Sequence, residues 1–170
     1  MTILVAVKTP DGPALYGDSL TSTELPYRTD LDRKIFAGRG CLYGFAGGAG
    51  ACERLAMAFH EAFGESLGDP PERCDVVRVL LNVEHAQDAE FLFVDRNDLY
   101  YGCGDGTLTA VRGPWATIGS GGAFVSGYLQ SKLDLGHDAT TDAEVRQALT
   151  ACFAAYPDAC GGRIDYLTLE

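Results

Sequence analysis

Strands and helices follow one another in groups along this chain of 170 residues, not one by one. Apolar runs typical of strands recur up to Gly47, and a 3.6-residue period then replaces them, with Leu55, Phe59 and Phe63 on one helix face. The predicted order is four strands, two helices, three or four strands, two helices and a last strand. A doubly wound parallel sheet requires strict alternation of strand and helix, so this order favours antiparallel sheets covered by helices, an α+β fold.

The predicted boundaries follow from turn residues and from the change of period. We expect strands at about 2–8, 13–18, 34–37, 41–46, 90–94, 98–102, 107–111, 115–119 and 163–169, and helices at about 55–63, 74–85, 121–134 and 141–156. The segment 19–33 is too hydrophilic for a core. No internal repeat or linker is visible, so we expect one domain over residues 1–170.

Composition and charge exclude several classes of partner. Hydrophobic residues make up 46% and charged residues 22% of the chain, which is typical of globular proteins. The net charge is −11 without any basic run, which argues against nucleic acid or an anionic membrane. No apolar run approaches the roughly 20 residues of a membrane span, and the first residues lack the features of a signal peptide. We therefore expect a cytoplasmic protein.

The histidines and cysteines indicate neither a metal nor a cofactor. The three histidines are scattered, and the six cysteines form no CxxC pair and have no histidine at zinc spacing. We expect buried, reduced thiols, as in other cytoplasmic proteins. A Ser-His-Asp site has no supporting G-x-S-x-G elbow.

The first strand, in MTILVAVK, predicts a largely buried segment that begins at Thr2. An ordered amino end needs a reason, because fixing a chain terminus costs entropy. A catalytic N-terminal threonine supplies one, since its own α-amine, with an ordinary pKa of about 7.7–8.0, acts as the base. Here Met1 must first be removed, because Met1 left in place would acylate the Thr2 amine.

Such a site also needs a cation that keeps the amine deprotonated, a carboxylate that holds the cation, and an N–H group for the oxyanion. The sequence offers Lys34 near the start of the third strand, Asp18 at the end of the second, and Gly47 where a strand meets a helix. A purely structural Asp18–Lys34 ion pair is the alternative. The GSGG run at 119–122 precedes a helix and is either an anion site or a turn that requires glycine.

At these residues the chain resembles the proteasome β-type family of N-terminal nucleophile hydrolases, and within it the bacterial HslV-like proteins. The matching motifs, in chain order, are TILVAV at 2–7, GDS at 17–19, DRKIF at 32–36, GFAGGAGAC at 44–52, ATIGSGG at 116–122 and AAYPDACGG at 154–162. The resemblance extends nearly from end to end. It implies a four-layer αββα sandwich, in which two antiparallel sheets lie between helix pairs.

The resemblance also implies roles for the catalytic residues. Thr2 is the nucleophile, Lys34 lowers the pKa of its amine, and Asp18 holds Lys34. The remaining implied residues are Gly47 as the oxyanion N–H, with Ser120 and Asp158 as the pair that orients the amine and relays its proton. Ser120 as a helix N-cap and Asp158 as a turn residue are the alternatives.

This sequence departs from the family pattern at a few positions. Ile3 stands where most active members have a second threonine, Leu20 replaces a residue that is usually polar or basic, and Cys160 falls where many members have serine.

Family position further implies a substrate pocket beside Thr2. Its walls would be formed by Thr21, Asp32, Phe36, Phe45, Ala49 and Glu53. Two carboxylates attract a basic side chain, whereas Phe45 at the base leaves little room for a bulky one. We expect weak cleavage after small or basic residues and little after aromatic ones.

The function that the resemblance implies is threonine-type peptide hydrolysis. The family encloses such sites in stacked rings, so self-association into rings of six or seven subunits, an unfolded protein or peptide substrate and an ATPase unfoldase are the implied partners. Two alternatives stay open: a catalytically inactive ring-forming subunit, and an N-terminal nucleophile amidase that acts on a small molecule.

Overall fold

The computed structural model describes residues 2–22, 28–29, 33–64 and 69–169. These residues form four α-helices, two larger antiparallel sheets and a two-stranded ribbon. The helices are α1 (Ala49–Phe63), α2 (Arg73–Leu81), α3 (Gly122–Asp134) and α4 (Asp142–Ala155). The predicted α+β class, a four-layer sandwich, is confirmed.

The first sheet has the strand order β10-β1-β2-β11 and is antiparallel throughout. Its strands are β1 (Ile3–Thr9), β2 (Gly12–Asp18), β10 (Trp115–Gly119) and β11 (Ile164–Thr168). The pairing places Ile3 opposite Gly119, so the beginning of the chain meets the GSGG segment. Residues about 115 positions apart in sequence thus become neighbours at one end of the sheet.

The second sheet has the order β5-β6-β7-β8-β9. Its strands are β5 (Ile35–Gly38), β6 (Cys41–Gly47), β7 (Ala89–Val94), β8 (Leu99–Cys103) and β9 (Leu108–Ala110). The ribbon consists of β3 (Thr21–Ser22) and β4 (Arg28–Thr29), so the hydrophilic segment 19–33 contains short strands that its composition does not predict.

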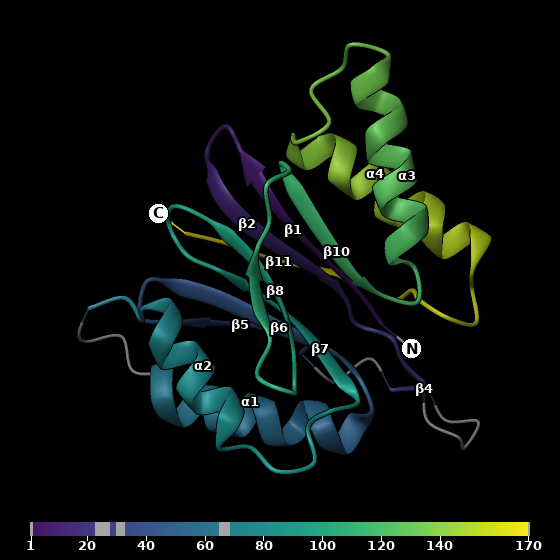
Figure 1. Ribbon diagram of the computed structural model, residues 1–170. Coiled ribbons are helices and arrows are strands. Elements are labelled where there is room, and N and C mark those ends of the chain that lie inside the picture. The colour runs from purple at the N-terminus through teal and green to yellow at the C-terminus, as the bar shows by residue number, and fades with distance from the viewer. Residues whose placement is uncertain (1, 23–27, 30–32, 65–68, 170) are drawn as a thin grey trace.

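Three apolar layers hold the sandwich together, and alternate residues of a strand serve different layers. Ile3, Val5 and Val7 of β1 face α3 and α4, whereas Leu4 and Ala6 face the other sheet. In Figure 1, α1 and α2 lie on one outer side of the stacked sheets, and α3 and α4 lie on the opposite side. Because β1 is covered on both faces, apolar side chains occupy both faces of the strand from Ile3 to Val7.

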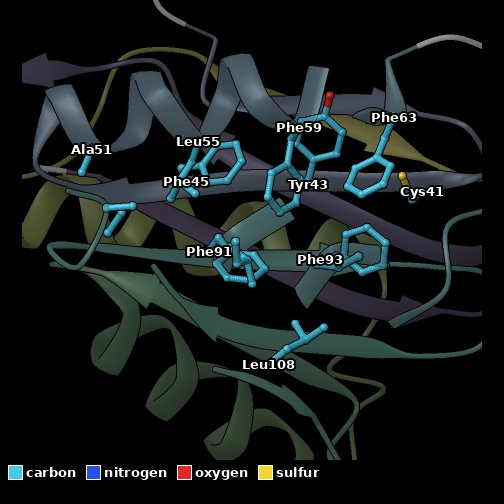
Figure 2. Packing of buried hydrophobic residues seen from close by; sticks show 14 residues of the cluster. Cys41, Tyr43, Phe45, Ala51, Leu55, Phe59, Phe63, Phe91, Phe93 and Leu108 are labelled. Atoms are coloured by element: carbon cyan, nitrogen blue, oxygen red, sulfur yellow. The ribbon is translucent and has the colours of Figure 1, made fainter. Parts of the chain in front are cut away.

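The layer beneath α1 is mainly aromatic. Leu55, Phe59 and Phe63, the predicted stripe of α1, face the second sheet, as Figure 2 shows, and Phe59 contacts Phe45, Phe63 and Phe91. The rings of Phe45 and Phe59 meet edge to face with their centroids 5.2 Å apart. This layer fixes the direction of α1, and therefore the position of the turn that joins it to β6.

Some predicted boundaries and burial states are wrong in detail. The helix predicted at 74–85 ends at Leu81, because the chain turns at Asn82 and reaches a positive φ of 56° at His85. Lys34 lies just before β5, not inside it. All six cysteines are free, but the predicted burial holds for Cys41, Cys152 and Cys160 alone, since Cys52 and Cys103 are half-buried and Cys74 is exposed. No helix among the described residues is long and apolar enough to cross a membrane.

Candidate active site

A buried ion pair lies at the end of β2. The Lys34 Nζ is 2.8 Å from the Asp18 Oδ1, and the side chains are 9% and 0% exposed, respectively. Lys34 also donates a hydrogen bond to the Leu20 carbonyl oxygen. Burying a single charge is costly unless it is paired and hydrogen-bonded, and both conditions are met here.

Asp18 connects this ion pair to two other parts of the chain. Its Oδ1 accepts a hydrogen bond from the Ile3 backbone N–H at 2.9 Å, and its Oδ2 accepts one from the Gly161 N–H at 3.2 Å. The first bond holds β1 one residue after Thr2. The second holds the loop after α4. A single carboxylate therefore orients the beginning of the chain, Lys34 and the late motif.

Thr2 is fixed by the segment that follows β10. The Ser120 backbone N–H donates to the Thr2 carbonyl oxygen at 2.9 Å. Gly119 has a φ of +82°, and a Cβ at this position would lie 2.0 Å from the Thr2 oxygen. Only glycine permits both this conformation and this approach, which explains the first glycine of GSGG.

Gly47 lies where β6 ends and α1 begins. Its φ is +134°, and a Cβ there would lie 2.1 Å from the Asp88 carbonyl oxygen. Gly48 is the N-cap of α1, and its N–H donates to that same carbonyl at 3.3 Å. The turn therefore packs directly against the residue before β7. This contact brings Asp88 and Glu90 close to Gly47.

These segments enclose a pocket of about 390 Å³. It is lined by Thr2, Ala46, Gly47, Asp88, Glu90, Gly119 and Ser120. Its volume falls in the range of small-ligand sites and suits a side chain or a short stretch of peptide. Three of the six predicted catalytic residues, Thr2, Gly47 and Ser120, therefore share one cavity.

The other predicted residues lie outside the lining of that pocket. Asp18 and Lys34 form the buried pair joined to Thr2 through Ile3. Asp158 is exposed in the turn after α4. The N-cap of α3 is Gly121 and no side chain caps this helix, so the alternative reading of Ser120 as an N-cap is wrong.

Cys160 lies in a buried thiol pair close to the ion pair. Its Sγ is 3.4 Å from the Cys152 Sγ. Burial, followed by the contact with Cys152, raises the pKa of Cys160 to about 12, and the Asp18 carboxylate adds to the rise. A thiol that stays protonated is a poor nucleophile, so Cys160 is a packing residue here.

The residues expected to form a substrate pocket are placed as follows. Phe45 is buried in the aromatic layer with Phe36 beside it, their ring centroids 6.3 Å apart. Ala49 and Glu53 are exposed at the beginning of α1. Asp32 lies outside the described residues, and only the backbone of Thr21 is described, so the composition of this pocket stays a prediction.

Sequence reasoning missed the carboxylates of the Thr2 pocket. Asp88 and Glu90 are separated from Thr2 by more than 80 residues, and neither belongs to a matching motif. One signal was available: Glu90 interrupts the apolar run of β7. Within the described part of the chain, no group of three or more His, Cys, Asp or Glu side chains is arranged to hold a metal ion.

Solved structures with this architecture were found at low sequence identity. HslV from Trypanosoma brucei is 16% identical with a TM-score of 0.72, and 99% of each chain is covered. BPH from Thiobacillus denitrificans is 16% identical with a TM-score of 0.73, again with 99% of each chain covered. The chain has the fold of HslV and BPH.

A further solved structure has the same architecture. A mutant of Anbu from Hyphomicrobium sp. strain MC1 is 15% identical with a TM-score of 0.72, over 100% of this chain and 82% of the Anbu chain. No family model matches the sequence. No curated protein matches it either. Tertiary structure thus shows the shared fold at 15–16% sequence identity.

Proposed function

We propose that this protein is a threonine-type peptidase in which Thr2 becomes the nucleophile once Met1 is removed. The observation that carries the proposal is the fixed position of Thr2. Its carbonyl is held by Ser120, the next residue is held by Asp18, and Asp18 is paired with the buried Lys34. A nucleophile whose own carbonyl and following N–H group are both held loses little entropy on reaching its attacking geometry.

The reaction follows from the chemistry of an N-terminal threonine. The Thr2 Oγ attacks a peptide carbonyl while the Thr2 α-amine accepts the hydroxyl proton. The Gly47 N–H stabilises the resulting oxyanion. The C–N bond then breaks, the leaving amine takes the proton, and an acyl ester remains on Thr2. Water, deprotonated by the same amine, hydrolyses this ester and restores the free hydroxyl.

Lys34 and Asp18 act on the amine in this scheme. Lys34 and the N–H of Ile3, the residue after Thr2, share the Asp18 Oδ1. In the proposal the Lys34 ammonium therefore acts on the Thr2 amine and disfavours a second positive charge there, so the amine stays a base near neutral pH. Asp18 keeps Lys34 in place. Ser120 and Asp158 are proposed to orient the amine and relay its proton, and Asp158 would have to act from its exposed turn.

The proposed assembly is a stack of rings that encloses the Thr2 sites. Its substrate is an unfolded protein or a peptide, which an ATPase unfoldase delivers to the rings. Three large apolar side chains on helices or near their ends support a docking role: Met57 is 67%, Leu81 69% and Leu135 75% exposed. Met57 and Leu81 belong to the layer of α1 and α2, and Leu135 directly follows α3, so each outer helix layer carries exposed apolar side chains.

The test combines mass, binding and turnover. Intact mass of the purified protein should lack one methionine, and fluorogenic peptides should be cleaved by the wild type and by Thr2→Ser but not by Thr2→Ala. BPH has been solved in complex with epoxomicin. We therefore expect epoxomicin to raise the melting temperature of the wild type and to leave Thr2→Ala unchanged.

Each failure has a distinct meaning. A full-length mass throughout would favour the inactive ring-forming subunit. Hydrolysis of small amides in the absence of any peptide cleavage would favour the amidase. Turnover that persists in Thr2→Ala would exclude Thr2 as the nucleophile.

A further inference from the structure

Glu90 of β7 is a charged residue in a row of apolar side chains. Alternate residues of a strand face the same side of the sheet, and Leu92 and Val94, the next two in this row, belong to the apolar layer between the two sheets. The residue opposite Glu90 on β6 is Ala46, which belongs to the same layer. Glu90 therefore ends an apolar row with a carboxylate, at the edge where the Thr2 pocket opens.

The Glu90 side chain is held in place by β8. The Tyr101 hydroxyl donates a hydrogen bond to the Glu90 Oε1 at 3.0 Å and lies 3.2 Å from the Cys103 Sγ. The contact with Cys103, burial and the Glu90 carboxylate all raise the pKa of Tyr101. The phenol thus remains protonated and can keep donating at neutral pH.

One carboxylate oxygen is left for a ligand. The described residues provide a donor to the Glu90 Oε1 and none to the Oε2. The described lining of the pocket contains a second carboxylate, Asp88, and no basic side chain. A half-buried carboxylate with a free oxygen, in a cavity that also contains Thr2, is a site for a positively charged group.

We propose that Glu90, positioned by Tyr101 and assisted by Asp88 at the rim, binds an ammonium or guanidinium group of the substrate next to the bond that Thr2 attacks. The inference rests on the proposed function for the identity of that bond, but the binding itself does not depend on catalysis. A charge-assisted hydrogen bond inside a pocket corresponds to about 10- to 100-fold in affinity. Glu90 is thereby a residue that determines substrate specificity.

The alternative role of Glu90 is structural, as the partner of the Tyr101 hydroxyl alone. Glu90→Gln separates the two roles, because the amide oxygen still accepts from Tyr101 while the negative charge is gone. Glu61→Gln, which removes an exposed carboxylate on α1, is the matched control. A structural role predicts no change in the ratio between charged and neutral substrates.

The turnover experiment uses internally quenched peptides of one sequence. The residue before or after the cut is Lys, norleucine or Glu, and one norleucine peptide carries a free amino terminus close to the cut. We expect kcat/KM for a cationic peptide to exceed that of its neutral partner by about tenfold or more. This ratio should collapse in Glu90→Gln and persist in Glu61→Gln.

A binding experiment keeps the inference independent of turnover. The same peptides are titrated calorimetrically into Thr2→Ala and into Thr2→Ala/Glu90→Gln. The inference is supported if cationic peptides bind more tightly to Thr2→Ala and this preference disappears in the double variant. This holds even when the wild type cleaves no peptide, and only the proposed function then fails. Preference confined to the free amino terminus identifies that amine as the cation. Equal affinity for lysine and norleucine peptides, or a lysine preference that survives Glu90→Gln, overturns the inference.

Discussion

Replacement of Lys34 by methionine tests the buried ion pair directly. The Asp18 side chain is fully buried, and Lys34 supplies its one charged partner among the described residues. Lys34→Met retains the length and apolar stem of the side chain but removes the ammonium group. Among the described residues, the Ile3 and Gly161 N–H groups then remain as donors to the Asp18 carboxylate.

The expected cost follows from the burial of the remaining charge. Removing one partner of a buried pair costs about 3–5 kcal/mol, and the two surviving N–H donors favour the lower end. With a urea m-value of about 2 kcal/mol/M, a loss of about 3 kcal/mol lowers the unfolding midpoint by about 1.5 M. The double variant Asp18→Asn/Lys34→Met should recover part of this loss, because asparagine can be buried without a counter-ion.

The matched control is the same substitution in an exposed pair. Lys8 lies 3.1 Å from Asp98, with side chains 40% and 46% exposed, so Lys8→Met should cost about 1 kcal/mol or less. The assay is urea unfolding followed by circular dichroism at one protein concentration, because assembly makes the midpoint depend on concentration. Equal midpoint shifts in Lys34→Met and Lys8→Met would refute the argument from burial. Under the proposed mechanism Lys34→Met also abolishes turnover, and Asp18→Asn reduces it less severely.

Two further predictions concern alkaline pH and assembly. Burial raises the pKa of Cys41 from 9.0 to about 12 and that of Tyr43 from 10.0 to about 12, so these groups stay neutral in the folded protein at a pH where the unfolded chain ionises. The stability that the two groups contribute is complete below about pH 9 and falls between pH 9 and 12. The measurement is the urea unfolding midpoint in reducing buffer as a function of pH. A midpoint that stays constant up to pH 11 would contradict this prediction. Sedimentation at micromolar concentration should show a large oligomer of the 18.1 kDa chain, and a monomer alone would remove the ring from the proposal.

The sequence by itself determined the type and order of most elements. The apolar run of β1 and the stripe of Leu55, Phe59 and Phe63 on α1 are local patterns, and each is confirmed because burying one face or both is a property of the segment itself. The resemblance to known motifs led to Asp18 and Lys34 as partners, and the 2.8 Å contact agrees with that expectation. The roles of the six candidate residues in catalysis remain predictions.

Only the tertiary structure decided what surrounds Thr2. The register of β1 on β10 places Ser120 against the Thr2 carbonyl, and the turn at Gly47 brings Glu90 into the same pocket. No local pattern contains this information, because the register between distant strands depends on packing across the whole sandwich. The side-chain period of a strand shows that Glu90 shares a face with Leu92, but not that this face ends in a cavity. A carboxylate that looks like an interruption of an apolar strand therefore becomes a candidate binding residue only when both sheets are in place.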